Sequence, residues 1–262
     1  MNLVTAGAGG VSGAAMSDGE WQLRCDLAAL YRLVAHFRMT DFIYTHISAR
    51  VPGPEHHFLI NRYGVLFHEM RASDLVKIDL DGRCVDARPE SEVNRAGFVI
   101  HSAIHAARPD LACVVHTHTA AGIAVSAQAA GLLPLSQHAA RFYGRISYHD
   151  YEGIALDTDE RERLVADLGA NSAMILRNHG LLVGGRSIPE AFLEIYFLER
   201  ACQAQIAAQS GGAALTPIPE AVALRVGAQF ASGSEQGAAA HAAMAWGSAL
   251  RLIENDRPDY RS

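Results

Sequence analysis

Apolar and polar positions in the first half of the chain predict one helix followed by short strands. Residues 18–38 repeat apolar side chains along one side of a helix, and Ser17 or Asp18 can cap its first turn. Apolar runs bounded by turn residues predict strands at 45–51, 57–61 and 75–80. The Asp81-Gly82 turn signal favours a hairpin from the last of these strands to Cys84.

The second half of the chain alternates between helical and strand patterns. Helices are expected at 93–107, 119–130, 159–168, 189–209 and 235–255. Apolar runs predict strands that lead into His118 and His179, and a further strand at 145–150. Gly131 is expected to end the Ala-rich helix before it. Mixed strands and helices around one sheet indicate an α/β fold.

Three segments follow from these patterns. Residues 1–16 are rich in Gly and Ala and are expected to be disordered. Residues 17–210 are expected to form one domain. Residues 211–262 are expected to contain a linker and a C-terminal helix, which packs on the same domain or on a neighbouring subunit.

Composition narrows the class of protein. The 262 residues are 50% hydrophobic, which is enough for a large core, and the formal charge is −6 without a basic block. Nucleic acid is therefore not an expected partner. No apolar run reaches the roughly 20 residues of a membrane helix, and the N-terminus lacks the features of a signal peptide. The four scattered cysteines favour reduced thiols in a cytoplasmic protein.

Three histidines carry the candidate chemistry. His116 and His118 end an apolar run, and in a strand their side chains lie on the same face. His179 ends a second apolar run and precedes Gly180. Three imidazoles with an open fourth position are typical of a catalytic metal site. His101 and His105 lie one helical turn apart without an acid between them, which favours helix packing or support of the site over a second metal pair.

Three strings resemble the class II aldolase/adducin family, from about residue 20 to residue 210. They are AGFVIHSAIHAARPDLACVVHTHTAAGIAVSA, YHDYEGI and ILRNHGLLVGG, and they are closest to adducin-like bacterial members. The resemblance implies a three-layer αβα sandwich around a mostly antiparallel sheet. It also implies a homotetramer with active sites at subunit boundaries. A divalent metal, usually zinc, is expected on His116, His118 and His179, with manganese, iron or cobalt as alternatives.

The catalytic acid/base of the family is altered in this chain. Its sugar-phosphate aldolases carry a Glu upstream of the His-x-His pair, and family spacing places that position at Gly97. Glu92 in Pro-Glu-Ser-Glu is the nearest replacement, although a carboxylate that starts a helix is the simpler interpretation. A family Tyr that donates a proton corresponds to His138, which is either an acid/base or a polar residue at a subunit boundary.

The phosphate pocket of the family is altered as well. Its small hydroxyl and amide groups are replaced near the corresponding positions, and the candidate substrate-binding residues are His46, Asn61, Arg62, Tyr63 and Arg95. Because arginine pairs well with a carboxylate, this set favours a non-phosphorylated acid. For Arg95 the ordinary alternative is a solvated arginine on a helix.

The resemblance and its departures together predict a metal-dependent lyase. It would cleave a carbon–carbon bond, by decarboxylation or retro-aldol cleavage, in a small carboxylate with vicinal oxygens. One alternative is a non-catalytic, adducin-like binding module, which the missing Glu favours. A metal-dependent epimerase or an oxygenase is a third, although three histidines without a carboxylate differ from the usual non-haem iron site.

Overall fold

The computed structural model describes residues 16–86, 93–153, 159–232, 234–255 and 258–262, and these residues contain one seven-stranded sheet. Its spatial order is β3-β2-β1-β4-β7-β6-β5. The strands are β1 (His46–Arg50), β2 (Phe58–Ile60), β3 (Val76–Ile78), β4 (Cys113–Thr117), β5 (Ile146–His149), β6 (Ala173–Leu176) and β7 (Gly180–Gly185). Neighbouring strands are antiparallel except for β5 and β6. The mostly antiparallel sheet expected from the sequence is confirmed.

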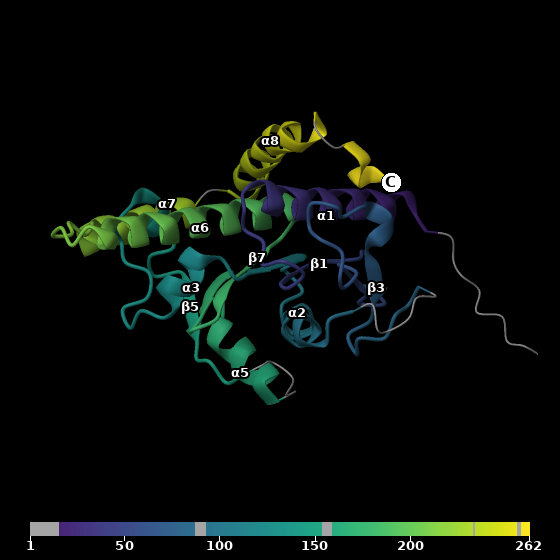
Figure 1. Ribbon diagram of the computed structural model, residues 1–262, viewed down its shortest axis with the longest axis horizontal. Coiled ribbons are helices and arrows are strands. Elements are labelled where there is room, and N and C mark those ends of the chain that lie inside the picture. The colour runs from purple at the N-terminus through teal and green to yellow at the C-terminus, as the bar shows by residue number, and fades with distance from the viewer. Residues whose placement is uncertain (1–15, 87–92, 154–158, 233, 256–257) are drawn as a thin grey trace, which may run out of the picture.

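Helices cover both faces of this sheet (Figure 1). The α-helices are α1 (Asp18–His36), α2 (Arg95–Ala107), α3 (Ala120–Ser126), α4 (Gln137–Arg141), α5 (Asp159–Leu168), α6 (Ile188–Ser210), α7 (Glu220–Ala231) and α8 (Glu235–Glu254). Short 3-10 turns lie at η1 (Ala72–Asp74) and η3 (Pro258–Arg261). In Figure 1, α1, α6, α7 and α8 lie on one side of the sheet, while α2 and α5 lie on the other. The three-layer arrangement is therefore confirmed.

Strand β4 shows how the sheet separates its two faces. Cys113 and Val115 belong to the large core shared with α1 and α6. Val114 belongs to the smaller core shared with α2 and α5. Because strand side chains alternate, His116 projects toward the side of α2 and α5. The first candidate ligand thus lies on the smaller-core side.

Several predicted elements differ from those observed. The helix predicted over 119–130 ends at Ser126, and Gly131 instead occupies a turn with a φ of 63°. Strand β7 and helices α4 and α7 were not predicted. Strand β7 ends in glycines, which are unusual in strands, so its sequence does not show a strand pattern. Gly184 is needed there because a Cβ would overlap the Leu111 side chain.

The C-terminal segment packs on the domain of its own chain. Helix α8 lies against α1 and α6, and the Trp246 ring lies 5.8 Å from that of Phe192. The expected linker holds α7 in addition to a stretch without helix or strand at 212–219. The expected disorder of 1–16 concerns residues outside the described part of the chain, apart from Met16. None of the helices within the described ranges has the length and apolar character needed to cross a bilayer.

Candidate metal centre

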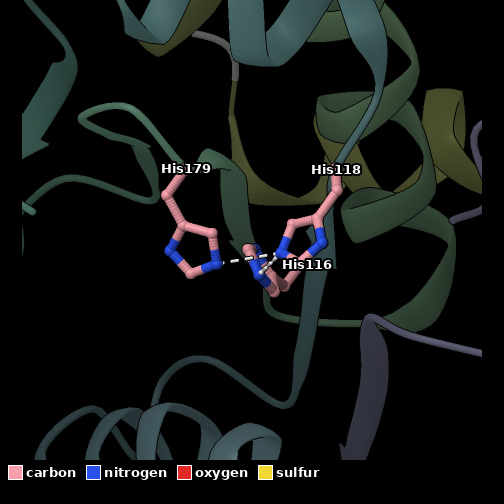
Figure 2. Close-up of side chains that lie close together, drawn as sticks. All are labelled: His116, His118 and His179. Atoms are coloured by element: carbon pink, nitrogen blue, oxygen red, sulfur yellow. Dashed lines mark hydrogen bonds between the residues drawn. The ribbon is translucent and has the colours of Figure 1, made fainter. Parts of the chain in front are cut away.

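The two strand ends that carry the three histidines are neighbours in the sheet. Strands β4 and β7 pair with Thr117 opposite Leu181, which places His118 beside the turn that contains His179. This turn depends on Asn178, whose φ of 54° lies in the left-handed region that asparagine tolerates. Figure 2 shows the three imidazoles facing one another at this point. The fold thus brings together residues that are 61 positions apart.

The imidazoles meet through their Nε2 atoms. His118 Nε2 lies 2.9 Å from His116 Nε2 and 2.9 Å from His179 Nε2. One nitrogen from each residue lies within 4.8 Å of the others, and this is the one group in the described chain whose His, Cys, Asp or Glu atoms could share a metal. Zinc binds imidazole nitrogen at about 2.0–2.1 Å, so nitrogens this close fit a single ion.

The far side of two rings is held by hydrogen-bond acceptors. His116 Nδ1 lies 2.9 Å from the Leu181 carbonyl oxygen, and His118 Nδ1 lies 3.0 Å from Asp41 Oδ2. An acceptor at Nδ1 keeps the proton there and leaves the Nε2 lone pair for a metal. Asp41 was missed from the sequence because it lies in the loop before β1, 77 residues from His118.

Electrostatics favour the neutral form of His116 and His179. Burial lowers the pKa of His179 to about 4, with smaller contributions from His118 and His149. Burial also holds the pKa of His116 well below its usual range, and the neighbouring histidines add to this. Since metals bind neutral imidazole, His116 and His179 are in their ligating form at neutral pH.

His46 lies directly opposite His116 on β1. Its side chain is buried, and burial followed by the charges of His118 and His179 lowers its pKa to about 3. Neither ring nitrogen has a hydrogen-bond partner within the described chain. A Cβ placed on Gly97, in the first turn of α2, would overlap the His46 ring. The space beside position 97 is thus filled from the sheet.

A buried polar chain continues from His46. The His46 and His101 rings lie 5.9 Å apart, and Ser48 Oγ lies 2.6 Å from His101 Nδ1 and 2.8 Å from His105 Nε2. Both α2 histidines are almost fully buried. Of the alternatives for this pair, the geometry favours packing and support beneath the candidate metal centre.

The other predicted substrate-binding residues lie in different surroundings. Asn61 is buried, and its Oδ1 accepts a hydrogen bond of 2.9 Å from the Tyr31 hydroxyl. In the loop after β2, Arg62 lies 3.5 Å from Asp74 in an ion pair, and Tyr63 is exposed. Arg95 begins α2. The structure thus places Asn61 and Arg62 against other partners, Tyr31 and Asp74, and not within the three-histidine group.

Of the two predicted acid/base residues, His138 lies within the described part of the chain. His138 is exposed on α4, and its ring lies 5.0 Å from that of Phe197 on α6. Glu92 lies outside the described residues. Neither prediction is decided by this geometry.

A small pocket beside His179 contains groups that the sequence did not single out. Its lining includes His149, Tyr151, Glu160, Arg177 and His179. His149 is buried, and its Nδ1 lies 2.7 Å from Asp167 Oδ2. The YHDYEGI string was the available signal, because it places His149 at the end of β5 beside β6.

The family whose description is "Class II Aldolase and Adducin N-terminal domain" matches residues 25–206. The chain belongs to this family. A crystal structure of an aldolase II superfamily protein from Pseudomonas syringae is 57% identical, with a TM-score of 0.87 over 94% of this chain and 98% of that one. The resemblance drawn from the sequence motifs is therefore confirmed.

Two further relatives of this chain are an adducin and a sugar-phosphate aldolase. Alpha-adducin from Rattus norvegicus is 48% identical over 202 residues, which cover 76% of this chain and 27% of the adducin. L-fuculose 1-phosphate aldolase from Glaciozyma antarctica is 29% identical, with a TM-score of 0.79 over 97% of this chain and 96% of that one. The family therefore includes a named aldolase and a named adducin, and both resemble this chain.

Proposed function

We propose that this class II aldolase family member is a divalent-metal-dependent lyase that cleaves a carbon–carbon bond by decarboxylation or retro-aldol cleavage. The observation that carries the proposal is the convergence of three Nε2 atoms, two of whose rings are anchored at Nδ1. Such anchoring orients an imidazole for a metal, because it fixes the ring and leaves the Nε2 lone pair free. The family's named aldolase relative supports the same reaction class.

The residues proposed to hold the ion are His116, His118 and His179, and zinc is the proposed metal. A bound divalent ion would supply Lewis acidity toward a substrate with adjacent oxygens. Manganese, iron and cobalt remain alternatives. Asp41 and the Leu181 carbonyl keep the first two rings in the orientation that leaves Nε2 free.

The proposed substrate is a small, non-phosphorylated carboxylate. Its proposed contacts are His46, Asn61, Arg62, Tyr63 and Arg95, a set in which arginines offer paired donors to a carboxylate. His138 is the proposed group that supplies or removes a proton, with Glu92 as the second candidate. In the described part of the chain the His138 ring packs against Phe197 on α6, so the proposed role requires that another subunit brings a His138 to the cluster.

We infer that the active form is a homo-oligomer, and we propose a tetramer with sites at subunit boundaries. The proposed compartment is the cytoplasm, and the proposal is supported by four cysteines that are all free thiols.

The test is elemental analysis of untagged protein beside two histidine variants. We expect about one divalent ion per chain in the wild type and a loss of the ion in His116→Ala. His68→Ala is the matched control, because His68 is an exposed histidine, and it is expected to keep its metal. Wild type that stays empty after metal is added back would overturn the lyase proposal.

A non-catalytic binding module is the second candidate. It is favoured by the glycine at position 97 and by the 48% identity to alpha-adducin. Incubating the metal-loaded protein with a panel of hydroxy acids and dihydroxy aromatic acids distinguishes the two functions. Release of carbon dioxide or an aldehyde supports the lyase, while a metal-replete protein that releases neither supports the binding module. Epimerase and oxygenase chemistry rank below both.

A further inference from the structure

At position 97, where family spacing places the aldolase Glu, the space for a side chain is filled by His46 from β1. Gly97 lies in the first turn of α2, and its Cα faces the imidazole of His46 on β1. A Cβ at residue 97 would overlap ring atoms of His46, so no side chain fits there while the imidazole stays in place. The His46 ring can occupy this position only because residue 97 is a glycine.

The His46 side chain projects from the same face of the sheet as the first candidate ligand. His46 and His116 are directly opposed in the antiparallel β1–β4 pair, where facing Cβ atoms lie about 5 Å apart. The ring of His46 is also near enough to His118 and His179 for their charges to act on it. His46 is thus adjacent to the cluster without belonging to the three-residue group that could share an ion.

Both ring nitrogens of His46 lack a hydrogen-bond partner in the described chain, although the residue is only 6% exposed. Buried polar groups in folded proteins are nearly always paired, so such a group beside a ligand site is suited to pairing with the ligand. The ring of His101 on α2 lies 5.9 Å from the His46 ring, at an interplanar angle of 74°.

We propose that His46 takes the place of the missing side chain at position 97, hydrogen-bonding an oxygen of the ligand that the metal holds, and that Gly97 exists to leave room for it. The ligand class is a small oxygen chelator, such as a hydroxy acid or a dicarboxylate. This inference rests on the proposed metal site and names the protein group that recognises the ligand there.

The binding experiment uses the full-length protein loaded with Co²⁺ and oxalate as the probe, followed through the visible absorption of the cobalt. We expect His46→Ala to keep about one metal per chain and to bind oxalate about tenfold more weakly, as the loss of one hydrogen bond to the ligand predicts. His68→Ala is the control: it removes an exposed histidine away from this arrangement, and oxalate affinity should change less than twofold.

A second measurement tests the steric half of the inference without metal. Gly97→Ala should lower the thermal midpoint of the wild type, while the same change in a His46→Ala background should lower it far less. If Gly97→Ala lowers the thermal midpoint equally in both backgrounds, the His46 ring is not what excludes a side chain at position 97, and the inference is wrong.

The remaining outcomes separate this inference from the proposed function. If His46→Ala lowers the metal content, His46 is itself a ligand and the inference is wrong, while the metal site stands. Unchanged oxalate affinity in His46→Ala, or a wild-type cobalt spectrum that ignores oxalate, overturns the inference alone. A wild type that takes up no metal overturns both, and the thermal measurement then reports only on packing.

Discussion

At His116 and His118, the ring nitrogen that faces away from the cluster determines what the other nitrogen can do. A backbone carbonyl holds the first ring, and a half-exposed carboxylate holds the second. The carbonyl belongs to β7 and cannot be removed by substitution, whereas Asp41 can. Only the His118 contact can therefore be altered by a point substitution of its acceptor.

Replacing Asp41 by Asn should weaken metal binding without unfolding the protein. The substitution removes the charge of the acceptor that orients the His118 ring, and losses of about 10–100-fold in affinity are typical for such partners. Competition with a coloured chelator measures the change. Asp81→Asn, at another exposed carboxylate, is the control and should bind as tightly as the wild type. Equal affinities in both variants would contradict a role for Asp41.

Acid should destabilise the metal-free protein through its buried histidines. Burial lowers the pKa of His105 to about 3, with a smaller contribution from Arg50, whereas an unfolded chain has a histidine pKa near 6.5. Between those values the unfolded state binds a proton that the folded state does not, so stability falls as the pH drops below about 6.5.

The expected slope for this residue is about 1.4 kcal/mol per pH unit, and it vanishes above pH 6.5. Urea unfolding in the presence of a chelator, from pH 7.5 down to pH 4.5, measures it. His105→Gln should reduce the slope by about this amount, and His68→Gln should leave it unchanged, because His68 is exposed. A wild-type stability that is independent of pH in this range would refute the assignment.

Among single residues, sequence reasoning reached the three candidate ligands but missed their supports. His-x-His at a strand end and a later His before glycine are local patterns, so they can be recognised without a structure. The placement of His46 over Gly97 depends on strand register and on how α2 docks, neither of which is a local property.

At the scale of elements, periodicity predicted the longer segments well. Helices α1, α2, α5, α6 and α8 were all expected near their observed bounds, because each combines an apolar face with a cap or breaker. Strand β7 was missed since it follows directly on the His179 turn and ends in glycines. Helix α4 is only five residues long, which is too short for a helical period to show.

The docking of α8 should depend on one aromatic side chain. Trp246 is only 8% exposed and packs against Phe192, so Trp246→Ala is expected to destabilise the protein by about 3–5 kcal/mol. Met244→Ala on the same helix is the matched control: that side chain is 67% exposed, and its loss should change stability by less than about 0.5 kcal/mol. Urea unfolding compares the two, and similar losses would contradict the packing.

At the scale of the whole molecule, the site draws on widely separated parts of the chain. The loop before β1, the end of β4 and the turn before β7 each contribute, while α4 carries His138 elsewhere on the surface. One chain therefore presents the candidate ligands without the proposed proton donor beside them. A neighbouring subunit is the proposed source of that donor.

The proposed tetramer predicts a mass of about 112 kDa, four times the 28.1 kDa of one chain. Light scattering coupled to size exclusion measures this mass directly. His138→Ala should retain the mass and the metal while losing activity. A monomeric wild type that is fully active would contradict sites shared between subunits.

The β4–β7 pair also sets the order in which the molecule can acquire its metal. His118 and His179 are 61 residues apart in sequence. The chain between them must therefore close into a loop, with β4 paired to β7, before the two side chains can share an ion. A ribosome-bound chain that has not yet released residue 179 holds two of the three ligands at the end of β4, a strand that can by then pair with β1 but not with β7. The complete three-histidine site therefore forms late in synthesis. The time at which the chain takes up an ion would report when the β4–β7 pair has formed.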